Sequence, residues 1–309
     1  MKSAGGIRRC AALVLAAATL CVAPLSWAAD RALFWSVEGP QGRAGWLLGT
    51  IHSEDPRVLD FPPALLDALA ASEVFAMELK PDLPTLARLT EVMHYQDGTT
   101  LGEVIGQHRF RNLAELLAPY HIREAQLSTM KPWAAMVTLS VPPPETGFFM
   151  DFSLSLRAAG DGKKVVGLET LDEQLAFLED MPMPLQLAML DQAMEEFDQA
   201  MTIYQEMLEI YLSGDLVRLQ EHAEGQMASL EPEALEYFME HGIRRRNLRM
   251  AEGTLPLLEA GPTFIAVGAL HLPGEQGLIQ LLRDAGYTLK PLPNLFASEP
   301  DTAMAAPTP

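Results

Sequence analysis

The chain has 309 residues, 49% of them hydrophobic, and a formal net charge of −19 at pH 7. Because an acidic protein repels phosphate backbones and anionic lipids, nucleic acids and anionic membrane surfaces are excluded as partners. The length suffices for one substantial core.

The first 28 residues, 1–28, have the pattern of a secretory signal peptide. Three basic residues precede an apolar run over residues 11–22, and small side chains at Ser26 and Ala28 occupy the two positions that decide cleavage. The apolar run is too short for a membrane-spanning helix. We therefore expect export to the periplasm or the medium. The mature chain would have a charge of −22, since three basic residues leave, and no integral membrane segment.

Both cysteines, Cys10 and Cys21, lie inside this segment, so the mature chain has none. The mature chain can form no disulfide, and it has neither a cysteine nucleophile nor a thiolate ligand for a metal. Any metal must therefore be bound by histidines and carboxylates.

The mature chain begins with a predicted β-hairpin. Residues Phe34–Glu38 alternate like a strand, and Gly39-Pro40 turns the chain toward an apolar strand over Trp46–His52. Gly49 lies three residues before His52, and a glycine inside a strand allows another backbone or a ligand to approach closely.

The next hundred residues alternate between helical and strand patterns. In chain order these patterns predict a helix over 62–71, a strand over Val74–Leu79, a broken helical region over 84–141, a helix over 148–159 and a strand over Lys164–Glu169. Each of the two strands has a carboxylate at its end, Glu78 in the first and Glu169 in the second.

The last part of the chain repeats the glycine–histidine pattern. Residues 172–260 are predicted to be almost entirely helical, and they precede an apolar strand over Phe264–His271. A helix that ends at Ala285 and a final strand over Tyr287–Lys290 follow. The alternation predicts one α/β domain over residues 29–293, with a mixed, largely parallel central sheet and large helical insertions. Residues 294–309 have no pattern and are predicted to be a disordered tail.

Four ionisable residues stand at predicted strand ends: His52, Glu78, Glu169 and His271. Open α/β sheets bind their ligands beyond the carboxyl ends of their parallel strands, so one site is expected to contain all four. Two imidazoles and one or two carboxylates suit Zn, Mn, Co or Fe. The alternative for each histidine is a polar residue satisfied within the fold, and for each glutamate a salt bridge or a helix cap.

A second feature is the basic run on the predicted helix around residue 246. Helical spacing places Arg246 and Asn247 on the same stripe as Met239, Ile243 and Met250, so these two polar residues are expected to point inward. A buried arginine needs an anion, which is either a carboxylate of the core or an oxygen of the substrate. Both alternatives stay open.

Several of these segments together resemble the TraB/GumN family. The segments are Leu47–His52, Met77–Leu79, Lys131–Trp133, Val166–Thr170 with Glu173-Gln174, Arg246-Asn247, and Val267–Gly274 with Gly277-Leu278. This family is similar to the Tiki metalloproteases and, more distantly, to erythromycin esterases and ChaN-like haem-binding proteins. The resemblance implies that His52, Glu78 and His271 bind a divalent metal, Mn or Co ahead of Zn. The sequence departs from the family where Phe149-Met150-Asp151 replaces a frequent Gly-Leu-Asp, and we assign Asp151 no role.

The function expected from the residues and the resemblance together is a metal-dependent hydrolase that cleaves peptide bonds. Glu169 or Glu78 would accept a proton from the attacking water, and Arg246 with Asn247 would stabilise the oxyanion. One alternative is a metal-free, esterase-like hydrolase in which a histidine is the base and a glutamate orients it. Another is a protein that sequesters a peptide or small ligand without turnover. The sequence leaves the substrate and the oligomeric state open.

Overall fold

The computed structural model describes residues 31–296, except residues 41, 228 and 229. The predicted signal peptide, residues 1–28, lies outside the described residues, as does most of the predicted tail. The first residues of that tail pack against the body of the protein. Asn294 Nδ2 donates to the carbonyl of Leu212 at 3.0 Å, and the Phe296 ring lies 5.5 Å from the ring of Tyr211.

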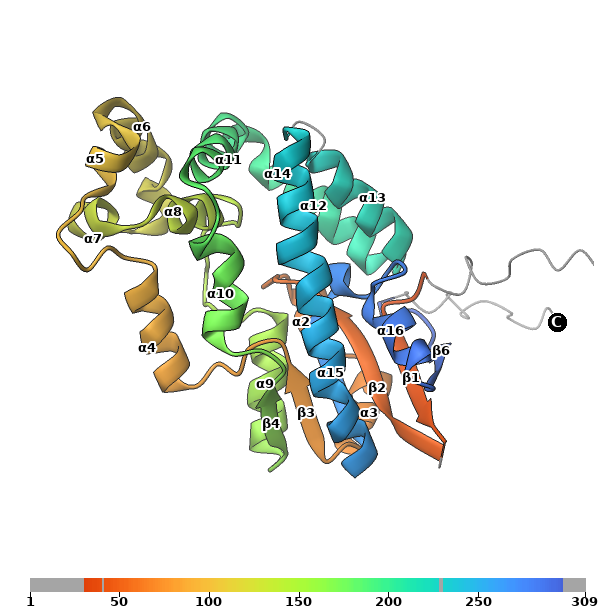
Figure 1. The fold of residues 1–309 in the computed structure, drawn as a ribbon. Helices are drawn as coiled ribbons and strands as arrows, with labels where there is room; N and C mark the ends of the chain where they lie inside the picture. The colour runs from red at the N-terminus through yellow and green to blue at the C-terminus, as the bar shows by residue number, and fades with distance from the viewer. Residues whose placement is uncertain (1–30, 41, 228–229, 297–309) are drawn as a thin grey trace, which may run out of the picture.

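A six-stranded mixed sheet forms the centre of the fold (Figure 1). In chain order the strands are β1 (Phe34–Gly39), β2 (Gly42–Thr50), β3 (Val74–Met77), β4 (Lys164–Gly167), β5 (Thr263–Gly268) and β6 (Thr288–Pro291). Their spatial order is β4-β3-β5-β2-β1-β6, and the first four of these run parallel to one another. Strand β1 is antiparallel to both of its neighbours. The predicted mixed, largely parallel sheet is confirmed.

The predicted hairpin and the two apolar strands are confirmed as well, but the strands end at Thr50 and Gly268, before the two histidines that the prediction placed inside them. Phe34 pairs with Leu48 in the antiparallel hairpin, and Trp46 of β2 pairs with Phe264 of β5 in parallel register. Strand β5 lies between β3 and β2 and is buried over most of its length. A strand covered on both faces needs a continuous apolar run rather than an alternating one, which is the pattern the sequence has.

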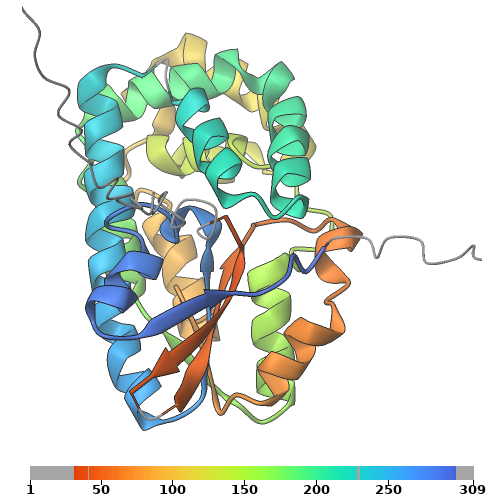
Figure 2. The ribbon, with the colours of Figure 1, turned by 90° about the vertical axis from the view of Figure 1, so that its right-hand side faces the viewer.

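Helices cover both faces of the sheet (Figure 2). Helices α15 (Arg245–Ala260) and α16 (Leu278–Asp284) lie on one face, while α2 (Pro56–Leu59), α3 (Pro63–Ala70) and α9 (Met150–Gly160) lie on the other. The short helix α2 has no counterpart among the elements predicted from the sequence. The sheet and these helices share one hydrophobic core, which includes Trp35, Phe75 and Phe264.

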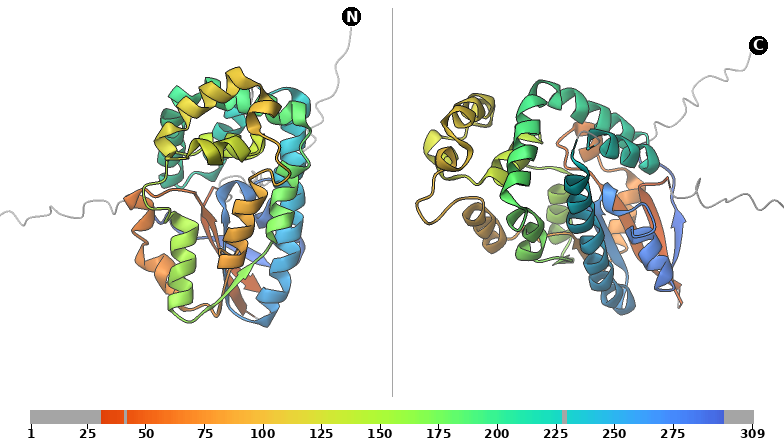
Figure 3. Two further views of the ribbon diagram at one scale, coloured as in Figure 1. Left: turned by 90° about the vertical axis from the view of Figure 1, so that its left-hand side faces the viewer. Right: turned by 45° about the horizontal axis from the view of Figure 1, so that its top comes forward.

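The remaining helices form a cap over one end of the sheet, from which α4 (Leu83–Val92) extends downward beside the β4 edge (Figures 1, 2 and 3). They are α4, α5 (Leu101–Ile105), α6 (Gln107–Leu116), α7 (Glu124–Thr129), α8 (Pro132–Leu139), α10 (Leu171–Glu179), α11 (Met183–Glu195), α12 (Phe197–Leu212), α13 (Leu216–Gln226) and α14 (Pro232–Tyr237). A second hydrophobic cluster, which includes Trp133, holds several of these helices together. The predicted large helical insertions are therefore confirmed.

The cap contacts the sheet at the carboxyl end of its parallel strands. Tyr211 of α12 donates a hydrogen bond to the carbonyl of Gly49 in β2 at 2.8 Å, and Gln174 of α10 donates to Glu78 just after β3 at 3.2 Å. Over residues 31–296, apart from the three undescribed positions, no helix combines the length and the apolarity needed to cross a membrane.

Candidate functional site

The sheet brings the four predicted strand-end residues to one edge. His52 follows β2, Glu78 follows β3 and Glu169 follows β4, while His271 ends a short 3₁₀ turn (Ala269–His271) that directly follows β5. Since β4, β3, β5 and β2 are parallel neighbours, their carboxyl ends meet at the same edge beneath the helical cap.

Gly49 and Gly268, each three residues before a motif histidine, allow neighbouring atoms to approach the backbone closely, as the sequence predicted. A Cβ atom on Gly49 would lie 3.0 Å from the Cα of Ala269, in the turn that contains the other motif. A Cβ atom on Gly268 would lie 3.1 Å from Oε1 of Glu78, and the backbone N–H of Gly268 donates to that same oxygen at 2.7 Å. The glycines therefore let the strand ends pack against one another.

Glu78 is largely buried and engages several donors. Its Oε1 accepts from the Gly268 N–H, and its Oε2 accepts from Arg246 Nη2 at 2.7 Å and from Gln174 Nε2 at 3.2 Å. Burial alone would raise the pKa of this carboxyl. The charges of His271 and Arg246 and the hydrogen bonds outweigh that effect and lower the pKa of Glu78 to about 2. Glu78 is therefore ionised at neutral pH.

His271 is buried, and its orientation is fixed by Asn247. The Asn247 amide donates through Nδ2 to the carbonyl of Gln276 at 2.8 Å, so its oxygen is the atom that faces the ring. His271 Nδ1 lies 2.6 Å from this oxygen and must therefore donate its proton to it. Burial lowers the pKa of His271 to about 4, so the ring is neutral at pH 7.

The neutral tautomer leaves the other ring nitrogen of His271 without a proton. This Nε2 atom lies 3.7 Å from Oε1 of Glu78. A lone pair on nitrogen therefore faces a carboxylate oxygen, and neither atom supplies a proton to the other.

Arg246 and Asn247 point inward from α15, as the stripe pattern predicted, and Arg246 binds two carboxylates. Its Nε and Nη2 donate to Glu169 Oε2 at 2.9 and 2.7 Å, and Nη2 also donates to Glu78. The Glu169 side chain is fully buried, and its other oxygen accepts from Arg249 Nη2 at 3.2 Å. Of the two anions considered for Arg246, the structure shows the carboxylates of the core.

His52 differs from His271 because its ring lies at the surface. Its side chain is 65% exposed, its Nδ1 lies 3.2 Å from Oδ2 of Asp151, and its ring stacks on Phe149 at a centroid distance of 4.4 Å. Desolvation lowers the pKa of His52, but the charge and hydrogen bond of Asp151 and the charge of Glu78 outweigh it. The pKa of His52 is therefore raised.

Asp151 is the residue that the sequence analysis left without a role. It is buried in the first turn of α9, where its Oδ1 accepts a hydrogen bond from the hydroxyl of Thr50. Two residues of the first Gly-x-x-His segment, Thr50 and His52, therefore share one carboxylate. The sequence offered one signal for this role, an acidic residue in the otherwise apolar first turn of a helix that packs on the sheet.

The three predicted metal ligands occupy two distinct arrangements. His271 and Glu78 face one another, whereas Nδ1 of His52 faces Asp151. Throughout the described part of the chain, no group of three or more His, Asp or Glu side chains is placed so that it could hold a metal ion. The metal ligands and the catalytic roles of Glu169, Arg246 and Asn247 thus stay predictions.

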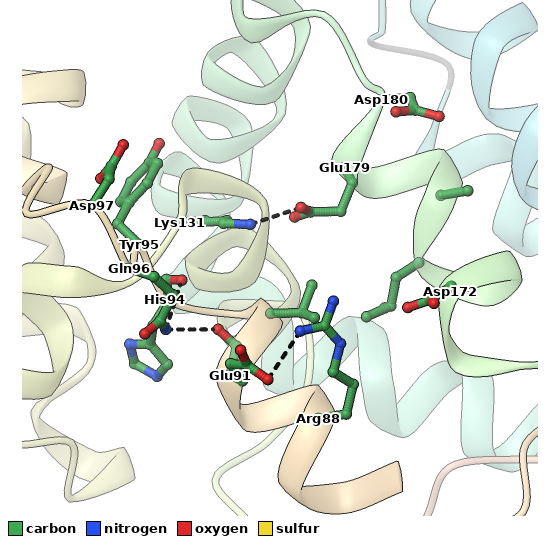
Figure 4. A pocket seen from close by; sticks show the side chains of 13 residues that line it. Arg88, Glu91, His94, Tyr95, Gln96, Asp97, Lys131, Asp172, Glu179 and Asp180 are labelled. Carbon is green, nitrogen blue, oxygen red and sulfur yellow. Dashed lines mark hydrogen bonds and ion pairs between the residues drawn. The ribbon is translucent and has the colours of Figure 1, made fainter.

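A pocket of about 740 Å³, apart from these residues, lies between α4, the loop of residues 94–97 and α10 (Figure 4). In its wall, Lys131 Nζ donates to Glu179 Oε2 at 2.7 Å. The indole N–H of Trp133 donates to the other oxygen of Glu179. The Lys-Pro-Trp segment of the family resemblance therefore joins α8 to the end of α10, which is a structural role.

Comparisons with known proteins agree with this arrangement of motifs. YbaP of Escherichia coli (strain K12) and YbaP of Shigella flexneri, both described as uncharacterized proteins, are each 26% identical to this chain over 249 residues. Each alignment covers 79% of this chain and 89% of the relative. No solved structure matches the chain significantly. The profile of the TraB/PrgY/gumN family matches residues 33–291, which include both Gly-x-x-His motifs, and the chain therefore belongs to this family.

Proposed function

We propose that this protein is an exported, metal-dependent hydrolase that cleaves peptide bonds. The observation that carries the proposal is the pair formed by Nε2 of His271 and Oε1 of Glu78, two acceptor atoms 3.7 Å apart. Because a nitrogen lone pair and a carboxylate oxygen repel each other, this arrangement is stable only when a cation or a proton lies between the two atoms. The low pKa of His271, about 4, disfavours the proton.

The spacing of His271 and Glu78 suits two ligands of one divalent cation. Nitrogen and oxygen ligands lie about 2.0–2.2 Å from such an ion, so two ligands of one ion are at most about 4.4 Å apart. His271 and Glu78 would hold the ion, and His52 would be its third ligand. Bound there, Mn or Co, or alternatively Zn, would supply a Lewis acid for the carbonyl of the substrate.

The other residues of the site prepare these ligands. Asn247 holds the Nδ1 proton of His271 and thereby keeps the Nε2 lone pair available, which is the usual role of an outer hydrogen-bond partner. Arg246 keeps Glu78 ionised. Both oxygens of Glu169 accept bonds from guanidinium groups, so in this proposal Glu169 orients Arg246 and does not accept a proton from water.

Metal binding to the purified mature chain tests this proposal. Elemental analysis after dialysis against Mn or Co is expected to find bound metal, and a metal concentration of about 100 Kd should stabilise the fold by about 2.7 kcal/mol. The gain should vanish in His271→Ala and Glu78→Gln but persist in the matched control His94→Ala, whose ring bonds Thr129 and lines the separate pocket. An equal gain in His271→Ala would show that the ion binds elsewhere.

One observation favours a second candidate, a metal-free hydrolase. His52 is exposed and its Nδ1 faces a buried carboxylate, which is the arrangement of a histidine base and its orienting acid. Here the orienting acid would be Asp151 and not a glutamate. Hydrolysis of a quenched peptide that survives EDTA but is lost in Asp151→Asn would favour this candidate. Hydrolysis that EDTA abolishes and Mn restores would favour the metal-dependent enzyme.

A further inference from the structure

The segment that follows Pro142-Pro143-Pro144 carries three phenylalanines, one of which contacts His52. The rings of Phe148 and Phe152 stack at a centroid distance of 5.5 Å, and Phe149 lies 6.3 Å from Phe152. Phe149 in turn stacks on the ring of His52 at 4.4 Å. The outermost residue of this aromatic group, Phe148, is 48% exposed.

The segment that carries these rings is fixed to the strand end that carries His52. The backbone N–H groups of Thr146 and Gly147 each donate to the carboxylate of Glu54 at 2.8 Å. The N–H of Met150 donates to the carbonyl of Ser53 at 3.1 Å. The aromatic group is therefore held in place before any ligand binds, so binding on it requires little ordering of the protein.

The group presents an apolar side chain at the surface, since Phe148 is exposed. The carboxylate of Glu54 accepts three hydrogen bonds, from two backbone N–H groups and the Thr146 hydroxyl. The carboxylate of Asp151 is buried between Thr50 and His52. The carboxylate of Glu54 is thus engaged by protein donors and that of Asp151 is buried, so neither of them covers the exposed ring of Phe148.

We propose that Phe148, Phe149 and Phe152 form a specificity subsite that binds an apolar or aromatic side chain of the substrate next to the bond that is cleaved. This proposal rests on the proposed function, because it takes His52 as part of the reacting site. A peptide whose carbonyl lies against the exposed ring of His52 has its neighbouring side chains within reach of Phe149, which stacks on His52, and of the exposed Phe148 next to it in the chain. Offset aromatic contacts at such distances add to binding beyond the area they bury.

Binding of short peptides to the mature protein tests the subsite without turnover. Two fluorescein-labelled Gly- and Ala-rich peptides, which differ only by Phe or Ser at one central position, are titrated in EDTA and followed by anisotropy. The wild type should prefer the Phe peptide. Phe148→Ser should weaken binding of that peptide by about 3–10-fold and leave the Ser peptide unchanged.

The matched control is Leu156→Ser, which removes an apolar side chain of α9 that is 46% exposed and lies outside the aromatic group. The subsite would be overturned if Leu156→Ser weakened binding of the Phe peptide as much as Phe148→Ser does. It would also be overturned if Phe148→Ser weakened binding of both peptides equally, or if the wild type bound both peptides with the same affinity. Quenched forms of the same peptides with Mn separate the two proposals. A preference for Phe with cleavage of neither peptide contradicts the hydrolase alone, whereas cleavage of both with equal KM contradicts the subsite alone.

Discussion

Replacement of Arg246 by methionine removes the only cation that contacts both buried carboxylates of the site in the described structure. Arg246 donates to Glu169 at 2.7 and 2.9 Å and to Glu78 at 2.7 Å. Removing one partner from a buried charge network typically costs about 3–5 kcal/mol, because a charge is left uncompensated in a medium of low polarity. We expect a loss toward the lower end, since Arg249 still contacts Glu169.

The assay is urea unfolding at pH 7.5 in EDTA, which gives the free energy of unfolding. The matched control is Arg245→Met, because Arg245 is 55% exposed and pairs with Glu240 at the surface, where such a pair contributes at most about 1 kcal/mol. The double variant Arg246→Met/Glu78→Gln should recover part of the loss, since Glu78 is the carboxylate that the single variant leaves without a cation. A loss below about 1 kcal/mol in Arg246→Met, or a double variant no more stable than the single one, would refute the reasoning.

Three further predictions follow from the site and the sequence. The pKa of His271 is about 4 in the fold against 6.5 unfolded, so the unfolded state binds more protons in this range. The free energy of unfolding in EDTA should therefore fall by roughly 3 kcal/mol from pH 6.5 to 4, and His271→Gln should flatten that slope. Gly268→Ala would press a methyl group on Glu78, so titration should show metal affinity lowered about 10–100-fold, while Gly160→Ala, which meets no atom, should bind normally. Mass spectrometry of protein from the native envelope should find a mature chain cleaved after Ala28, and a retained Met1 would contradict export.

The sequence predicted those features that depend on burial along one element. The apolar runs before His52 and His271 predicted strands because a buried strand excludes polar residues, and both strands are central in the sheet. The inward placement of Arg246 and Asn247 followed from helical periodicity, and both side chains are buried. Parallel strands also required the motif histidines to lie at one edge.

What the sequence could not predict are contacts between residues that are distant in the chain. Asp151 contacts Thr50 only because α9 packs beneath the end of β2, and no local pattern encodes that packing. The partners of Arg246 come from two different strand ends that are distant from it in the chain. The sequence therefore could not show whether the anion bound by Arg246 is a carboxylate of the core or an oxygen of the substrate. The π-helical turn over Phe238–Arg244, which precedes α15, also had no sequence signal.

The position of β5 in the sheet has a consequence for how the chain acquires its structure during synthesis. Strand β3 pairs only with β4 and β5, and β2 pairs only with β1 and β5, so without β5 the described sheet would separate into two unconnected parts. Strand β5 is made late, after the entire helical cap. A nascent chain that stops before Thr263 would therefore carry His52 and Glu78 on parts that are not joined. Strand β5, which joins the two parts of the sheet, and His271, which follows it, are synthesised one directly after the other. The site can therefore form only after nearly the whole chain has been synthesised.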